Sequence, residues 1–171
     1  MRSLILAAAF AAFGFAQTAS AAPVALAPVV IAPQLQTQFD TNYGAREQTY
    51  LTGLVVHDVT EALKRQGGDV AASGPITIEV TLVRADPNRP TFEQMGRPPF
   101  PDFASFSVGG AELHAVLRSA DGRVLTEVST RRYDPQLDEF VATSSTWAAA
   151  RRAISVFASD VAAAYREHSQ N

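Results

Sequence analysis

Side chains able to perform acid–base or metal chemistry are scarce in this sequence of 171 residues. It contains three histidines and no cysteine, so a thiol nucleophile, a thiolate metal site and a disulfide are all excluded. Glu112 and His114 stand two positions apart in a segment of alternating polarity. Both would therefore point to one face of a strand and could offer two ligands to a metal. No third ligand follows at a spacing such as H-E-x-x-H, so we expect no metal site and no cofactor.

Other catalytic constellations are also missing from the sequence. No G-x-S-x-G motif is present, and the pair Gly109-Gly110 lacks the context of a phosphate-binding loop. This pair is more typical of a bulge or a close approach between backbones. The acidic pair Asp138-Glu139 belongs to a polar turn, where we expect it to be solvated. The net charge of −3 gives no electrostatic reason to expect a nucleic acid or an anionic membrane as partner. We therefore expect a protein that is not an enzyme.

One long segment, residues 86–107, has a distinct composition. It holds five of the ten prolines and four of the ten phenylalanines. Connections of this length without regular structure are uncommon in compact domains, and disordered linkers are poor in aromatic residues. Two interpretations follow: the phenylalanines cover one end or the open face of the sheet, or the loop binds a partner. The candidate binding residues are Arg89, Phe92, Met95, Arg97, Phe100, Phe103 and Phe106.

Two functions of different classes are compatible with this loop. The first is a non-catalytic interaction or accessory protein that binds another periplasmic or envelope protein through the loop and through an open sheet edge. The second is a binding module for a small ligand, an amphiphile or a cell-wall fragment. In that case the phenylalanines would line a pocket, and Arg89 or Arg97 would pair with an anionic group.

The first 21 residues have the order of a secretory signal peptide. A short positive start at Arg2 is followed by an apolar run over residues 4–16 and by the small residues Ala19-Ser20-Ala21. The apolar run is too short to span a bilayer. We therefore expect cleavage after Ala21 and a single domain over residues 22–171. A periplasmic or secreted location follows, without lipidation, since no cysteine is available.

Periodicity predicts the remaining elements. The cluster Thr143-Ser144-Ser145-Thr146 offers good N-cap residues for the last helix, and Trp147 begins its apolar stripe. Asp121-Gly122 is typical of a tight hairpin turn. The predicted elements are a strand at 27–32, a helix at 44–66, strands at 75–85, 109–119 and 123–132, and a helix from 147 to about 168.

The predicted order is β-α-β-β-β-α, and each helix has a single apolar stripe. Such elements pack most simply as an α+β fold, with two helices on one face of a four-stranded, mainly antiparallel sheet. Extended Val29-Val30-Ile31-Ala32-Pro33, with a long helix ending at Gly67-Gly68, makes this layout similar to small exported envelope domains. It resembles the TolB N-terminal domain and the LpoB-type activators of penicillin-binding proteins. The resemblance implies an interaction module but transfers no functional residue.

Overall fold

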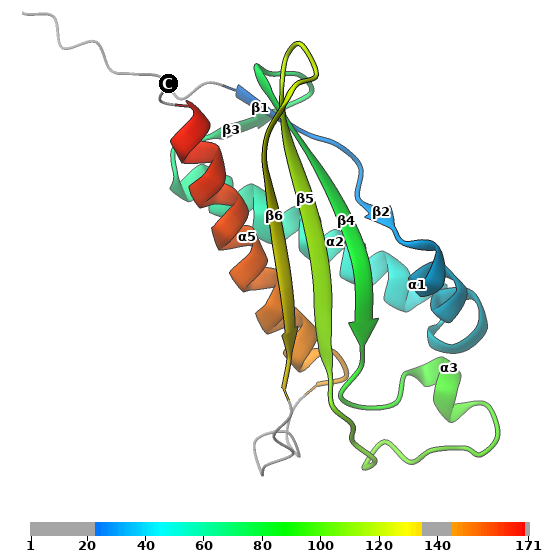
Figure 1. The fold of residues 1–171 in the computed structure, drawn as a ribbon. Coiled ribbons are helices and arrows are strands. Elements are labelled where there is room, and N and C mark those ends of the chain that lie inside the picture. Colours follow the sequence, from blue (N-terminus) through cyan, green and yellow to red (C-terminus); the bar gives the residue numbers. More distant parts are fainter. Residues whose placement is uncertain (1–22, 135–144, 170–171) are drawn as a thin grey trace, which may run out of the picture.

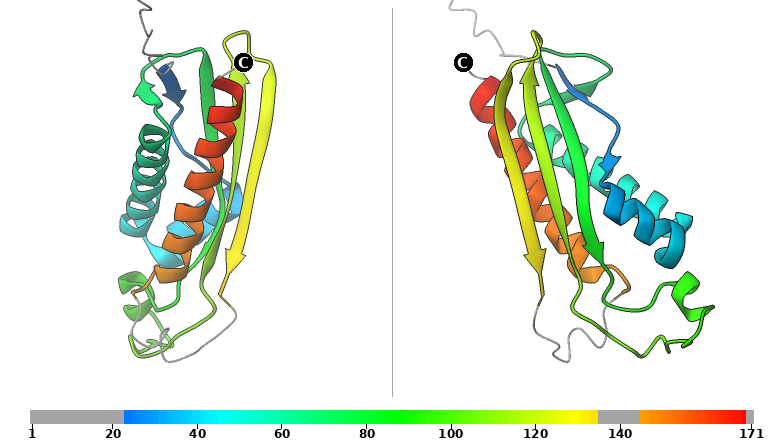
Figure 2. Two further views of the ribbon diagram at one scale, coloured as in Figure 1. Left: turned by 90° about the vertical axis from the view of Figure 1, so that its left-hand side faces the viewer. Right: turned by 45° about the vertical axis from the view of Figure 1, so that its right-hand side comes forward.

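The computed structural model describes residues 23–134 and 145–169. A long, twisted sheet forms one layer, and helices α2 and α5 lie across one of its faces (Figure 1 and Figure 2). The predicted signal peptide, the residues Thr143 and Ser144, and the pair Asp138-Glu139 lie outside the described residues. The helices and strands follow in the order β1 (Pro23–Leu26), β2 (Val30–Ile31), α1 (Pro33–Gln38), π-helix η1 (Phe39–Tyr43), α2 (Ala45–Arg65), β3 (Asp69–Ala71), β4 (Ile76–Asp86), α3 (Phe92–Met95), β5 (Gly110–Ser119), β6 (Val124–Tyr133) and α5 (Ala148–Ser169).

The two long helices form where apolar periodicity predicts them. In α2, Leu51, Val55 and Val59 are fully buried along one stripe, whereas Val56 is exposed. The helix ends where Gly67 takes a φ of 81°. The N–H of Gly67 donates to the carbonyl of Lys64, and the N–H of Gly68 donates to that of Leu63. This pair of bonds is the Schellman arrangement, which a glycine in the left-handed conformation permits.

The sheet differs from the prediction in strand number and direction. The α+β class is confirmed, but the described sheet has six strands in the order β3-β1-β4-β5-β6, with β2 also paired to β4. β1 runs parallel to both β3 and β4, and β2 runs parallel to β4. Only β4, β5 and β6 form the antiparallel part. The prediction of a four-stranded, mainly antiparallel sheet is therefore wrong.

The predicted strand at 27–32 contains only β2, and the first strand of the sheet, β1, lies before the predicted range. Ala27 still donates to the carbonyl of Ile78 at 2.9 Å, but the next residue is Pro28, which has no N–H to give to the ladder. Pairing resumes at Val30 and Ile31, opposite Thr81 and Leu82. The extra strand β3 is only three residues long, too short to show a period of its own.

The hairpin of β5 and β6 is confirmed at Asp121-Gly122. Gly122 has a φ of 84°, and its N–H donates to the carbonyl of Ser119 at 2.8 Å. The carboxylate of Asp121 accepts from the Ser119 hydroxyl and from the N–H of Arg123. These bonds to the ionised carboxylate lower the pKa of Asp121.

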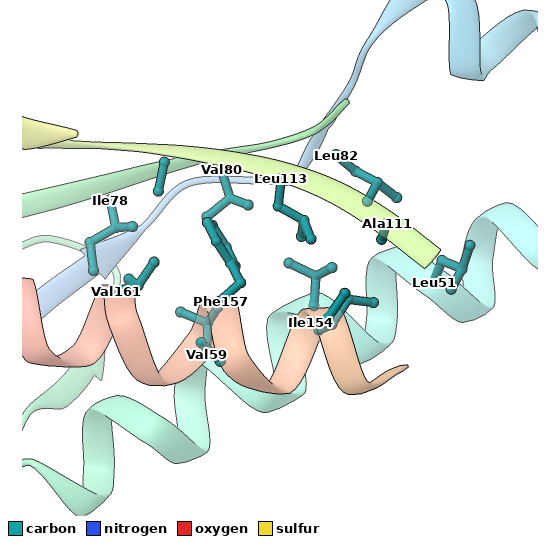
Figure 3. Close-up of a cluster of buried hydrophobic side chains, with 14 of the residues drawn as sticks. Leu51, Val59, Ile78, Val80, Leu82, Ala111, Leu113, Ile154, Phe157 and Val161 are labelled. Atoms are coloured by element: carbon teal, nitrogen blue, oxygen red, sulfur yellow. The ribbon is translucent and has the colours of Figure 1, made fainter. Parts of the chain in front are cut away.

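The core lies between the two long helices and the inner face of the sheet (Figure 3). Alternation along the strands is confirmed there, since every second residue from Ile76 to Leu82 and from Ala111 to Leu117 is buried, and the pattern in β4 shifts at the bulge between Leu82 and Arg84. Figure 3 shows side chains of both layers meeting in one apolar cluster, which includes Leu51, Val59, Ile78, Val80, Leu82, Ala111, Leu113, Ile154, Phe157 and Val161. This continuous cluster fixes the positions of both long helices on the sheet.

Two adjacent valines of α2 provide a matched test of this packing. Val55 is fully buried, and Val56 is 41% exposed. We expect Val55→Ala to lower the free energy of unfolding by about 2–3 kcal/mol, because it removes buried methyl groups and leaves a cavity. Val56→Ala should cost about 0.5 kcal/mol or less. Urea denaturation of both variants measures the difference, and equal losses would contradict the assignment of the buried stripe.

Candidate functional site

The segment between β4 and β5 is more structured than its composition predicts. It contains the short helix α3, capped by a reciprocal pair of bonds between Thr91 and Gln94. The N–H of Gln94 donates to the Thr91 hydroxyl at 3.2 Å, and the N–H of Thr91 donates to the Gln94 side chain at 2.9 Å. This T-x-x-Q spacing is a capping box, a signal that is visible in the sequence. We call residues 86–107 the Pro/Phe loop.

Asn88 closes the base of the Pro/Phe loop and is 1% exposed. Its backbone N–H donates to the carbonyl of Thr146 at 2.7 Å, and its side-chain oxygen accepts from the N–H of Ala149 at 2.8 Å. Its carbonyl accepts from the N–H of Ser107 at 2.9 Å, and the Ser107 hydroxyl donates to the carbonyl of Pro87 at 2.7 Å. One buried residue, through its backbone and its side chain, therefore joins both ends of the loop to the start of α5. No local sequence pattern predicts this role, because the partners of Asn88 at Thr146 and Ala149 lie far away in the sequence.

The pair Gly109-Gly110 provides the close approach that the sequence predicts. A Cβ atom on Gly109 would lie 2.5 Å from the amide carbon of Asn88. A Cβ atom on Gly110 would lie 2.3 Å from the carbonyl oxygen of Arg132. Real Cβ contacts are not this short, so both positions exclude a side chain. Asn88 can therefore take its observed position only because residue 109 has no side chain.

Arg89 is turned into the loop and is 7% exposed. Its guanidinium donates to the carbonyl of Phe103 at 2.7 Å and lies over the Phe103 ring, 5.2 Å from the centroid. Arg89 thus links the start of the loop to Phe103, near its end, through a hydrogen bond to the carbonyl and a cation–π contact with the ring. The candidate Arg89 therefore supports the loop from inside.

Arg97 connects the tip of the loop to the corner between η1 and α2. It donates to the carbonyl of Thr41 and forms an ion pair with Glu93. Nearby, the guanidinium of Arg46 lies over the Phe92 ring, 5.5 Å from its centroid. The loop is thus fixed at the corner through Arg97 and at its base through Asn88.

The four phenylalanines of the loop remain on the surface. Exposed fractions are 69% for Phe92, 63% for Phe100, 51% for Phe103 and 47% for Phe106, and Met95 is half-buried. The interpretation that these rings cover the end or the open face of the sheet is therefore wrong. The predicted site residues lie in one loop, in which Arg89 is buried, Arg97 is exposed but bonded to Glu93 and Thr41, and the four phenylalanines are exposed.

Phe100 also has an unusual backbone conformation. Its φ is 54°, and it is the only described residue other than glycine with a positive φ. A bulky residue in this region costs roughly 1 kcal/mol or more, and such residues cluster at functional sites. The N–H of Phe100 donates to the carbonyl of Arg97 at 2.7 Å, which closes the turn that presents the ring.

A separate cavity of about 500 Å³ lies between α1 and the end of β4. Its lining includes Leu35, Tyr43, Arg84, Asp86 and Glu112, and none of the candidate residues of the Pro/Phe loop. Burial, followed by the nearby Asp86 carboxylate, raises the pKa of Tyr43 to about 12. Arg84 and Asp86 form an ion pair at 2.8 Å. The phenylalanines therefore do not form the wall of this cavity.

The residues with metal-binding chemistry each contact a side chain of β6 and do not form a common cluster. His114 lies 3.2 Å from Glu127, and Glu112 lies 3.7 Å from Arg131. Within residues 23–134 and 145–169, no group of three or more histidines and carboxylates could hold a metal ion. In the same ranges, no helix is long and apolar enough to cross a membrane.

Comparisons with known proteins identify a fold and not a family. No family model matches the sequence. No curated protein matches it either. Among solved structures, a Xanthomonas campestris protein of family DUF330 has 15% identity and a TM-score of 0.51, covering 88% of this chain and 89% of that one. This likeness shows a shared fold.

Two further structures are more distant. A PelC dodecamer from Paraburkholderia phytofirmans has 7% identity and a TM-score of 0.49, over 84% of this chain and 86% of that one. A minor lipoprotein from Acinetobacter baumannii has 8% identity and a TM-score of 0.38, over 85% and 93% of the two chains. No functional residue is transferred from any of the three.

The role of Asn88 can be tested against another asparagine. Asn88→Ala should lower the free energy of unfolding by about 2–4 kcal/mol, because it removes a helix cap and leaves a buried N–H without a partner. Asn42→Ala removes the same amide from η1, where it bonds only the neighbouring Gln38 side chain, and should cost about 0.5 kcal/mol. Thermal or urea unfolding compares them. Similar losses at both positions would contradict the role assigned to Asn88.

Proposed function

We propose that this chain is a non-catalytic, periplasmic interaction or accessory protein that binds a protein partner through the Pro/Phe loop and an open sheet edge. The observation that carries the proposal is the exposure of Phe92, Phe100, Phe103 and Phe106 on a loop whose base is buried. Clustered aromatic side chains on a surface are a liability for a protein without a partner. Export rests on the signal-peptide pattern of residues 1–21.

The loop has the properties of a pre-ordered binding segment. Asn88 and Thr91 are each 1% exposed, and Arg97 holds the tip of the loop through the Thr41 carbonyl. A loop that is already fixed loses little conformational entropy when it binds. Exposed phenylalanines on such a frame can enter pockets of a partner and contribute most of the binding free energy.

The alternative of a small-ligand module receives less support from the geometry. That function needs the phenylalanines to line a pocket and Arg89 or Arg97 to receive an anion. Here the guanidinium of Arg89 is engaged with Phe103, and that of Arg97 with Glu93 and Thr41. The cavity beside α1 is built from other residues. Protein binding is therefore the better proposal.

A variant that changes only the exposed rings tests the loop. Phe92, Phe100, Phe103 and Phe106 are replaced together by serine, while Asn88, Arg89 and Thr91 stay, so that the buried base is kept. We expect at least about a tenfold loss of partner binding, since exposed aromatic contacts of this kind each contribute about 1 kcal/mol or more. Binding is measured by quantitative pull-down and cross-linking with envelope extract, and circular dichroism monitors the fold.

The matched control replaces Tyr50 and Val56, which are 42% and 41% exposed on α2, by serine. This control also removes exposed apolar surface, but away from the loop, and should leave the captured partners unchanged. Identical partner profiles for the wild type and the loop variant would overturn the proposal. So would an equal loss in the control, because the loop would then have no special role.

A further inference from the structure

β6 forms one edge of the sheet and has a free side. It is the last strand in the order β3-β1-β4-β5-β6 and pairs only with β5 along its ten residues. In Figure 2 no other strand lies beyond it. Within the described residues, the outer N–H and C=O groups of β6 therefore have no strand partner. Such an edge is a template for pairing with another strand.

The pairing register between β5 and β6 determines which residues of β6 bond outward. The N–H of Asp134 donates to the carbonyl of Gly109 at 3.0 Å, continuing the register that pairs Gly110 with Tyr133. In an antiparallel ladder, alternate residues bond toward the neighbouring strand and the others bond away from it. Even-numbered residues from 126 to 134 thus bond to β5. The backbone groups of Glu127, Ser129, Arg131 and Tyr133 point to the open side.

A twofold rotation would bring opposite charges at these positions against each other. When Ser129 lies opposite Ser129 of a second antiparallel β6, Glu127 lies opposite Arg131 and Arg131 lies opposite Glu127. Centring the pair on Glu127 or on Arg131 instead would place like charges opposite each other, which is destabilising. We propose that β6 pairs antiparallel with β6 of a second copy of this chain, with Ser129 at the twofold axis. This inference deepens the edge part of the proposed function.

Charged side chains on an edge strand usually discourage association. Here Glu127 and Arg131 are exposed and stand four residues apart around Ser129, so that a second copy presents the opposite charge at each position. In the ladder with β5, Glu127 lies opposite Val116 and Arg131 lies opposite Glu112. The side chains of Glu127 and Arg131 therefore lie on the sheet face that is turned away from the helices. The charge pattern therefore favours the register centred on Ser129, because it places opposite charges against each other.

The neighbouring helix adds an apolar contribution. Asp160 of α5 accepts from the Thr130 hydroxyl at 3.4 Å, so this side of α5 faces β6. Val156 lies one helical turn before Asp160, on the same side of the helix, and is 38% exposed. A twofold axis perpendicular to the sheet would place the two α5 helices on one face of a continuous sheet. Val156 would then lie near its symmetry mate.

Sedimentation equilibrium of the purified protein, without extract, tests the proposal. The wild type should form a dimer. Glu127→Arg and Arg131→Glu should each weaken it by about tenfold or more, because two attractive pairs become two repulsive pairs of up to about 1 kcal/mol each. The double variant Glu127→Arg/Arg131→Glu should restore the dimer. Arg132→Glu is the matched control, since Arg132 bonds toward β5 and lies opposite Thr126 in the proposed register.

Ser129→Pro gives a second test that spares the intramolecular ladder. The N–H of Ser129 points outward, so proline removes a donor for the second copy and none for β5. We expect a folded monomer by circular dichroism and sedimentation. A monomeric wild type, or a dimer unaffected by both Glu127→Arg and Ser129→Pro, would overturn the proposal. The outcome is independent of the proposed loop function, because the loop variant with four serines should remain dimeric.

Discussion

The arrangement of the Pro/Phe loop relative to the sheet depends on one buried amide, that of Asn88. Its oxygen bonds the first turn of α5, and its backbone bonds Thr146 and Ser107. A buried polar group is stable only when its hydrogen bonds are satisfied, so each of these partners constrains the others. The bare backbone of Gly109 leaves the space that the amide occupies. As a result the end of β4, the start of β5 and the start of the C-terminal helix share a fixed geometry.

This fixed base explains how a loop of 22 residues can hold phenylalanines in water without collapsing onto the core. Polar and cationic side chains support it from within: Arg89 binds the carbonyl of Phe103, and Arg97 binds that of Thr41. Hydrogen bonds to backbone are directional, so they order a loop without needing apolar side chains to be buried. The four rings therefore remain exposed. β6 shows a similar separation, since the backbone groups of alternate residues bond to β5 and those of the other residues have no strand partner within the described residues.

The regular elements could be predicted because their periods are long and clear, as in α2, α5 and the antiparallel strands. β3 has three residues and no measurable period, and the division of β1 from β2 depends on the missing N–H of Pro28. Parallel pairing of β1 with β4 is set by tertiary packing, which local pattern does not encode. The composition of residues 86–107 identified the loop, and the spacing Thr91-x-x-Gln94 is a capping-box pattern that indicates α3. The roles of Asn88 and Arg89 were not predictable, since their partners lie far away in sequence or in the loop's other limb.

The place of β1 between β3 and β4 bears on the order in which the chain can fold. Val24 is fully buried and pairs with Val70 on one side and Ile76 on the other. Both partner strands come after α2, so the first strand to be synthesised has no edge to join until the chain has closed a loop of more than forty residues. Such non-local pairing slows folding, because loop entropy is lost before contacts form. The N-terminal segment of the described chain must therefore remain unpaired while the middle of the protein is made.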